Sequence, residues 1–187
     1  MKNQTPVSFV AWRAAHLAGR LARLLRAGDF AAGLNPAQWE ALRYLARANR
    51  FSRTPAALAD YLNSSRGTVS QTLIALEEKG LIEKTRSATD ARSTLLSLTA
   101  AGQAMLSHDS EAMIARAIDE TGVAPEVAAA LEAALSRALA GRGGKAFGVC
   151  KTCRHFRRGA PAHHCSLLDM PLAAQETLAI CAEMEAA

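Results

Sequence analysis

The chain has 187 residues, half of them apolar, and its 22 lysines and arginines exceed its 17 aspartates and glutamates by a net charge of +5. This length and apolar content exclude a disordered chain and fit one compact domain with a small appendage. Basic and acidic residues balance from residue 150 onward, so the surplus belongs to the earlier part, as on a surface that binds a polyanion. No run of about eighteen uncharged apolar residues occurs, and the first residues lack a secretory cleavage signature, so we expect a cytoplasmic protein with no membrane partner.

A long amphipathic helix is predicted at the start of the chain. From Val7 to Leu24, apolar residues recur at steps of three and four, and arginines occupy the other faces. Either a partner subunit or the body of the same chain can bury this apolar stripe. Asn35 and Pro36 then predict a second helix, because a polar cap followed by proline is typical of a helix N-terminus, and we expect it to end near Ala48.

Two short helices joined by a tight turn are predicted next. A helix over residues 55–61 is followed by a break at residues 63–65, whose polar side chains can cap another helix. On that other helix Val69, Leu73 and Leu76 share one face, which leaves the polar residues near its N-terminus on the open face. A DNA-reading helix presents its N-terminal residues in this way, and an ordinary solvated helix is the alternative.

A β-hairpin follows the two short helices. Residues 81–86 and 94–99 are typical of strands, and residues 87–93 form the polar loop between them. A hairpin in this place is the wing of a winged helix-turn-helix, with Asp90 and Arg92 at or near its tip.

Two further helices are predicted after the wing. Apolar residues from Leu106 to Ile118 indicate one long helix, and those from Val127 to Leu139 recur at every fourth position on another. Together with the first helix, these two can bury one another across a two-fold axis. Methionines at the spacing seen here are typical of a core, so a small-molecule pocket is not favoured.

Three motifs resemble those of the multiple antibiotic resistance regulator family, known as MarR. They are Leu76-Glu77-Glu78-Lys79-Gly80-Leu81-Ile82, Asp90-x-Arg92 and Leu98-Thr99-x-x-Gly102. The resemblance covers about residues 5–140 and implies a fold that is mainly α with a small β-hairpin wing. It further implies an obligate homodimer, with the outer helices as the interface. Two winged helix-turn-helix lobes are then expected to bind a pseudo-palindromic double-stranded DNA operator, with repression as the family default.

The same resemblance implies which side chains meet DNA. The DNA-binding residues are predicted to be Ser65, Arg66, Gly67, Thr68, Ser70 and Gln71 on the recognition helix and Arg86, Asp90 and Arg92 on the wing. Arg66 and Gln71 suit base reading, because arginine can bind guanine and glutamine can bind adenine through two hydrogen bonds. Arg92 is expected to enter the minor groove, with Asp90 holding it in place, and to contribute affinity more than specificity.

Four cysteines, the only ones in the chain, follow the family-like part as Cys150-x2-Cys153-x11-Cys165-x15-Cys181. We therefore divide the chain into residues 1–147, with the DNA reader at about 36–100, and a metal-binding or iron-sulfur extension at 148–187. In a reducing compartment clustered cysteines are more often metal ligands or redox groups than disulfides. The spacing is similar to the ligand layout of some four-iron, four-sulfur DNA-processing enzymes, and Cys181 is expected on a helix over Leu172–Glu185.

Several interpretations of the cysteines are open. Four thiolates suit either a 4Fe-4S cluster or tetrahedral zinc, and a site of three cysteines with His163 or His164 is a further arrangement. An iron-sulfur cluster is slightly favoured, because a regulator needs a state that changes, whereas zinc would be structural or sensory. A metal-free thiol switch is another alternative. A thiol oxidoreductase is not favoured, because its motif usually opens a helix within a strand-helix-strand unit, and no strand-rich scaffold is predicted around Cys150 and Cys153. We therefore expect no enzyme.

The position of the extension directly after the presumed dimerisation helices suggests how a signal could travel. We expect the intact site to order residues 148–187 against those helices and to set the spacing of the two recognition helices. Loss of the site would then change operator affinity.

Overall fold

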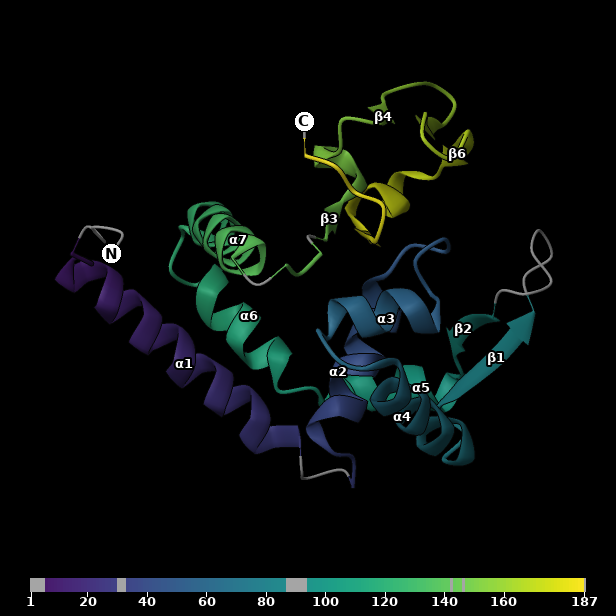
Figure 1. Cartoon of the computed structure of the whole chain (residues 1–187), viewed down its shortest axis with the longest axis horizontal. Helices are drawn as coiled ribbons and strands as arrows, with labels where there is room; N and C mark the ends of the chain where they lie inside the picture. Colours follow the sequence, from purple (N-terminus) through teal and green to yellow (C-terminus); the bar gives the residue numbers. More distant parts are fainter. Residues whose placement is uncertain (1–5, 30–32, 87–93, 142, 146, 187) are drawn as a thin grey trace.

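The computed structural model shows a helical body followed by a small β-rich C-terminal unit (Figure 1). It describes residues 6–29, 33–86, 94–141, 143–145 and 147–186. The elements in chain order are α1 (Phe9–Asp29), α2 (Pro36–Arg47), α3 (Pro55–Tyr61), α4 (Arg66–Glu78), β1 (Ile82–Arg86), β2 (Thr94–Leu98), α5 (Ala100–Met105), η2 (Leu106–His108), α6 (Glu111–Asp119), α7 (Ala124–Ala140), β3 (Gly148–Val149), η3 (Cys150–Thr152), β4 (Phe156–Arg157), β5 (His163–Cys165), β6 (Met170–Leu172), η4 (Ala174–Leu178) and β7 (Ile180–Cys181). The mainly helical fold with a hairpin wing is confirmed.

Side-chain caps explain where the helices of the reader begin. Asn35 accepts a hydrogen bond from the backbone of Gln38, whose side chain accepts one from the Asn35 backbone in return, and Pro36 opens α2. Thr54 caps α3 and Ser65 caps α4 in the same manner, through hydroxyls that accept backbone N–H groups. These caps satisfy donors that a helix N-terminus leaves without intrahelical partners.

The core of the reader is made by α2, α3, α4 and the β1–β2 hairpin. Its largest fully buried side chains are Trp39, Tyr44, Leu42, Leu45, Leu58, Leu73, Leu76 and Leu96. The hairpin is antiparallel, with Ile82 opposite Leu98 and Arg86 opposite Thr94. Burying these apolar surfaces is the main source of stability for the reader.

Gly102 is required where the wing returns to the helical body. A Cβ at this position would lie 2.0 Å from the carbonyl oxygen of Leu81. Thr99 caps α5 by accepting from the Gly102 amide at 3.1 Å, and its hydroxyl donates to the Gly80 carbonyl at 2.6 Å. The Thr99-x-x-Gly102 motif therefore has a physical cause, which is close backbone contact between α5 and the start of β1.

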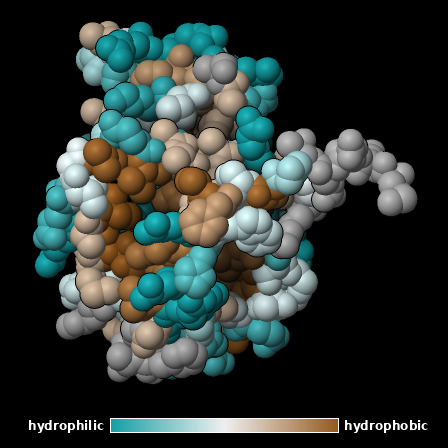
Figure 2. Space-filling model, turned by 90° about the vertical axis from the view of Figure 1, so that its left-hand side faces the viewer, coloured by the Kyte–Doolittle hydropathy of each residue, from teal (hydrophilic) through white to brown (hydrophobic). Residues whose placement is uncertain are grey.

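An apolar surface runs over α1 and α7. The apolar side chains of α1 are exposed along its length, including Phe9, Val10, Leu17 and Leu24, and no residue of α7 is buried. Figure 2 views the molecule from this side and shows hydrophobic residues gathered on it. The helices predicted to meet a partner thus leave their apolar faces uncovered in the single chain.

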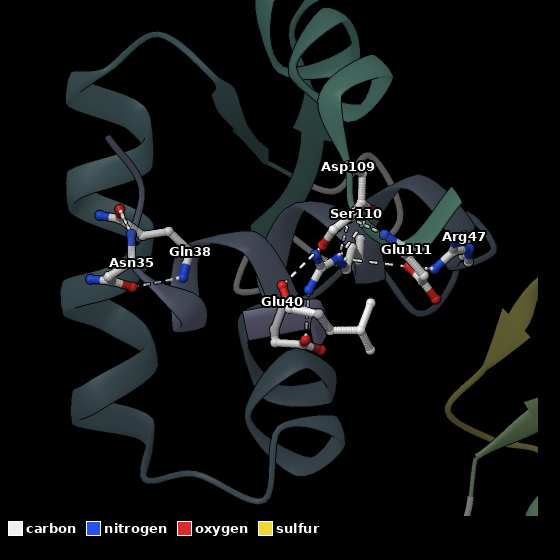
Figure 3. Close-up of polar contacts among 9 residues, drawn as sticks. Asn35, Gln38, Glu40, Arg47, Asp109, Ser110 and Glu111 are labelled. Carbon is white, nitrogen blue, oxygen red and sulfur yellow. Dashed lines mark hydrogen bonds and ion pairs between the residues drawn. The ribbon is translucent and has the colours of Figure 1, made fainter. Parts of the chain in front are cut away.

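The predicted long helix over Leu106–Ile118 is wrong, because the chain bends at Asp109 between η2 and α6. The Asp109 carboxylate is nearly fully buried and accepts hydrogen bonds from Arg43 of α2, the shortest of 2.6 Å (Figure 3). It also accepts from the Glu111 amide at 2.9 Å, which starts α6. The bend gives this carboxylate its buried partner, an interaction that helical periodicity cannot reveal.

The C-terminal unit contains short antiparallel strands. β3 pairs with β7, and β4, β5 and β6 form a second small sheet. The predicted helix over Leu172–Glu185 is therefore wrong, since only the short η4 forms there and Cys181 lies on β7. Pairing with β3 and with the body of the chain overrides the local helical preference of this alanine-rich segment. Within the described ranges, no helix is long and apolar enough to cross a membrane.

Candidate functional site: a helix face and a cysteine pocket

The N-terminal half of α4 presents the predicted recognition residues to solvent. Val69, Leu73 and Leu76 are buried against the reader's core, as the spacing predicted. The residues brought together on the opposite, exposed side are Ser65, Arg66, Gly67, Thr68, Ser70 and Gln71. They form one polar surface at the start of a helix.

Two of these side chains also stabilise the helix start. The Ser65 hydroxyl accepts from the Thr68 amide at 3.1 Å and lies 2.8 Å from the Thr68 hydroxyl. Arg66 forms an ion pair with Asp60 of α3 at 3.0 Å, and its side chain remains 59% exposed. Such a surface pair contributes little free energy and can be exchanged readily for another anion. Arg66 is thus oriented by α3 while remaining accessible to a polyanion.

The wing is described up to its loop. Arg86 is exposed at the end of β1, and Lys84 on the same strand pairs with Glu77 of α4 at 2.7 Å, which ties the hairpin to the recognition helix. Asp90 and Arg92 lie outside the described residues. Their predicted roles stay predictions.

All four cysteines line one small pocket of the C-terminal unit. Cys150 begins η3, Cys153 directly follows it, Cys165 ends β5 and Cys181 ends β7, so three separate segments converge. The side chains that share the pocket with them are His155, Phe156, Leu167, Leu168, Leu172 and Glu183. Four thiols therefore face a common space with largely apolar walls.

Cys150 and Cys181 interact with each other within this pocket. Hydrogen bonding to Cys150 lowers the pKa of Cys181 to about 6, against the opposing effect of burial, and the Glu183 amide adds to the lowering. The pKa of Cys150 is raised because its thiol hydrogen-bonds to Cys181, and burial adds to this rise. This interaction favours the thiolate form at Cys181 more than at Cys150. Thiolates are the form that binds metals and reacts with oxidants.

Four cysteine sulfurs suit a group that is bound by thiolates, but the four side chains do not surround an ion-binding position. Among the described residues, no three His, Cys, Asp or Glu side chains are grouped closely enough to hold a metal ion. The space between the cysteines amounts to about 10 Å³, close to that of one water molecule. With Zn–S bonds of about 2.3 Å, four sulfurs around zinc would lie roughly 3.8 Å apart, whereas the larger cubane would hold its four cysteine sulfurs farther apart.

The histidines are arranged differently from the predicted alternative of three cysteines and one histidine. His163 packs on the Phe156 ring at 5.1 Å between centroids, and His164 lies 3.3 Å from Asp169. The histidine among the pocket residues is His155. Strands do surround the Cys150–Cys153 motif, contrary to expectation, but they pair antiparallel and give no strand-helix-strand unit.

Two residues near the cysteines were missed in the sequence analysis. The Asn49 side chain donates to Cys150 Sγ at 3.7 Å, and the Ser52 hydroxyl accepts from the Ala182 amide at 2.8 Å. Both lie between α2 and α3, about a hundred residues before the first cysteine. No sequence signal connects them to it, because the contact arises from tertiary packing alone.

A larger open cavity of about 480 Å³ lies where α2, α3, α7 and the start of the C-terminal unit meet. Tyr61, Leu135 and Phe147 are among its lining residues. The Phe147 ring packs edge-on against Tyr61 at 5.2 Å between centroids. Its volume lies in the range of small-molecule pockets, although the methionine spacing in the sequence did not favour such a pocket.

Comparison with known proteins shows that the helical body of the chain has a known fold. The MarR family matches residues 32–93. Similar solved structures include the Staphylococcus aureus MepR–DNA complex, at 21% identity and a TM-score of 0.52, covering 73% of this chain and 99% of that one. BldR from Sulfolobus solfataricus has 20% identity and a TM-score of 0.51, covering 68% and 92%. The MarR family transcription regulator SP03579 has 25% identity and a TM-score of 0.52, covering 71% and 91%. Among curated proteins none matches in sequence. MepR is covered almost completely, so part of this chain has no counterpart in it.

Proposed function

We propose that the chain is a regulator that binds DNA through α4 and the wing, on the basis of the match of residues 32–93 to the MarR family. The observation that carries this proposal is the exposed polar face at the start of α4, held on a buried apolar face. MarR-family proteins are transcriptional regulators and not enzymes, which agrees with the expectation that this chain is not an enzyme. The MepR structure of the same fold is a complex with DNA.

The proposed DNA contacts divide by chemistry. Arg66 and Gln71 are exposed on α4 and can form paired hydrogen bonds with base edges in the major groove. Ser65, Thr68 and Ser70 suit phosphates or bases, Arg86 adds positive charge at the end of β1, and Arg92 keeps its predicted role in the minor groove. Arg66 is already oriented by Asp60, so little conformational entropy is lost when it binds.

A second copy of the chain is the proposed partner for the apolar surface of α1 and α7. Leu131 and Leu135 on α7 and several residues on α1 are exposed in the single chain. Contiguous apolar surface of this kind is typical of a subunit interface. Two-fold pairing of these helices would present two α4 helices, which suits a pseudo-palindromic operator.

For the extension we propose a 4Fe-4S cluster held by Cys150, Cys153, Cys165 and Cys181, through which the regulator senses iron or oxidants. The convergence of all four cysteines on one apolar pocket supports it. Such a cluster supplies a redox-active centre that can change or be lost. Phe156, Leu168 and Leu172 would limit access of water to it, and Asn49 would donate a hydrogen bond to a ligand sulfur.

A metal-free thiol switch is the second candidate, favoured because Cys150 and Cys181 line one pocket and because the pKa of Cys181 is lowered. A zinc site with four cysteine ligands is the third arrangement that uses the same side chains. Each predicts a different composition of the purified protein.

One purification tests these alternatives. The full chain is purified without oxygen, and iron, sulfide and zinc are measured per chain with the absorption spectrum, alongside Cys153→Ser. Iron and sulfide that the variant lacks support the cluster. Stoichiometric zinc, or no metal with a reversible disulfide, overturns it in favour of the corresponding alternative.

A second experiment tests DNA binding. A duplex selected from a random library with the wild-type protein is titrated with Arg66→Ala and with Gln71→Ala. Unchanged affinity for both variants contradicts the proposed contact between α4 and DNA.

A further inference from the structure

The segment between α2 and α3 is buried to an extent unusual for a connection. Ala48, Asn49 and Ser52 are each at most 2% exposed. Connections normally lie on the surface, because buried backbone groups need partners. The residues from 48 to 53 are here named the junction loop, and its buried members contact the C-terminal unit, whereas Arg50 is exposed.

The junction loop is bonded to the residues on both sides of Cys181. The Asn49 amide donates to the Ile180 carbonyl at 2.9 Å, and the Ala182 amide donates to the Ser52 hydroxyl at 2.8 Å. Phe51 packs against the buried cluster formed by Cys150, Leu172 and Cys181. A displacement of the β7 backbone at Cys181 therefore acts on the junction loop directly.

Asn49 uses both ends of its side chain at this junction. Its Oδ1 atom accepts from the amides of Phe51 and Ser52, at 3.1 and 2.9 Å, and so fixes the turn of the junction loop. Its Nδ2 atom donates to Cys150 Sγ at 3.7 Å. One buried amide thus joins the shape of the loop to a sulfur atom of the pocket.

The other side of the junction loop holds the DNA reader. The Ser52 carbonyl accepts from the Tyr44 hydroxyl of α2 at 2.6 Å and from the amide of Thr54, the cap of α3, at 2.9 Å. The Arg53 carbonyl accepts from the Leu96 amide of β2 at 2.8 Å, which reaches the wing. The loop is therefore bonded to two helices and the wing of the reader.

Resting on the proposed function, we propose that the junction loop carries the state of the cysteine pocket to the DNA reader, with Asn49 and Ser52 as its positioning residues. Oxidation or loss of the proposed cluster moves Cys150 and Cys181. The hydrogen bonds of Asn49 and Ser52 then break or lengthen, which releases the start of α3 and the wing. This route differs from the path through the dimerisation helices that the chain order suggested. It acts inside each lobe, so the angle of α4 and the wing changes as well as the distance between two lobes.

Hydrogen exchange tests the route without any knowledge of the operator. Amide exchange of the full chain is compared as purified without oxygen and after a chelator has removed the metal. We expect exchange at Asn49, Ser52 and Leu96 to rise by about tenfold or more, with α7 unchanged. Faster exchange confined to α6 and α7, or unchanged exchange at the three amides, overturns the route. If the purified chain holds no metal, the cofactor proposal fails separately, and the same comparison of reduced with oxidised protein decides the route.

Substitutions test whether the bonds themselves transmit the effect. Asn49→Asp keeps the acceptor for the loop amides but removes the donor to Cys150, and Ser52→Ala removes the acceptor for the Ala182 amide. Ser166→Ala is the matched control, because its hydroxyl bonds the His155 carbonyl within the C-terminal unit. The measured quantity is the ratio of affinities for the selected duplex between loaded and stripped protein, with metal content and melting temperature recorded.

A coupling of this kind is typically about 5- to 150-fold in affinity. We expect wild type and Ser166→Ala to show such a ratio, and Asn49→Asp and Ser52→Ala to fall towards one while still holding their metal. Wild-type ratios in both junction variants overturn the role of these residues. A ratio of one in the wild type instead refutes the proposed sensor, and the exchange result then shows whether the junction is coupled at all.

Discussion

The DNA reader and the C-terminal unit are stabilised in different ways. The reader buries a tryptophan, a tyrosine and many leucines between three helices and a hairpin. Among the described residues of the C-terminal unit, Cys150, Leu172 and Cys181 form a small separate hydrophobic cluster, with Phe51 of the junction loop packed against it. Short chains with so little apolar core need cross-links or metals to fold. The reader has a large apolar core, to which Ala182 of the C-terminal unit also belongs, whereas the extension depends on its sulfur atoms and on the surface it covers.

The largest expected effect is loss of order in the extension alone. Cys153→Ser, or metal removal from the wild type, should make residues 148–186 sensitive to protease while the reader keeps its cooperative melting transition. A structural metal can contribute on the order of 10 kcal/mol to folding, far more than the small apolar core here. Proteolysis followed by mass spectrometry measures it, with Ser166→Ala as the control that keeps the four sulfurs. Loss of both transitions together would show that the two regions fold as one.

A buried ion pair offers the next largest effect, this time in the helical body. Arg43→Met leaves the Asp109 carboxylate, whose side chain is 6% exposed, without its principal partner. Breaking such a pair costs about 3–5 kcal/mol, measurable by urea unfolding. Arg47→Met is the control, since its side chain is 52% exposed. Metal content should not change in either variant, and a parallel loss of metal would contradict the independence of the two regions.

The same ion pair gives a pH dependence of known sign. Burial acts to raise the pKa of Asp109, but hydrogen bonds from Arg43 and the Glu111 amide prevail, and the pKa is lowered. A lowered pKa contributes stability above the unfolded value near 4, and this is lost as pH falls through the folded pKa. Wild-type stability should therefore decline below about pH 4 more steeply than that of Arg43→Met.

The two regions also differ in how far their sequence predicts them. In the reader, local rules agree with the structure: Asn35-Pro36, Thr54 and Ser65 cap helices, and Gly102 is required by a backbone contact. Local interactions of this kind can be predicted from the spacing of residues along the chain. In the extension, the spacing of the cysteines indicated a common site, but its strands and the Asn49 and Ser52 contacts depend on pairing with distant residues. The bend at Asp109 was missed for the same reason.

A smaller effect concerns the surface that the reader and extension leave uncovered. Leu135 on α7 is 61% exposed in the single chain and lies on the face proposed to meet a second copy. Leu135→Glu should weaken self-association by about tenfold or more, because a buried carboxylate at an apolar interface costs over ~1.4 kcal/mol. Sedimentation equilibrium measures it, and Glu132→Gln on the same helix is the control. An unchanged association constant for Leu135→Glu would place the interface elsewhere.

The smallest effect separates folding from DNA reading at one residue. Ser65 caps α4 by accepting from the Thr68 amide at 3.1 Å, so Ser65→Ala should cost about 1 kcal/mol of stability. Ser65→Asp keeps an acceptor at the cap and places a negative charge at the positive end of the helix dipole, so stability should recover. In the proposed complex the same charge repels the DNA phosphates. The DNA affinity of Ser65→Asp should therefore stay below that of wild type although its stability recovers. Thermal melting and duplex titration are measured on both variants, and a Ser65→Asp protein that binds the selected duplex as tightly as wild type would remove the start of α4 from the DNA interface. Metal content should stay constant throughout, because the cap lies in the reader and the sulfurs lie in the extension.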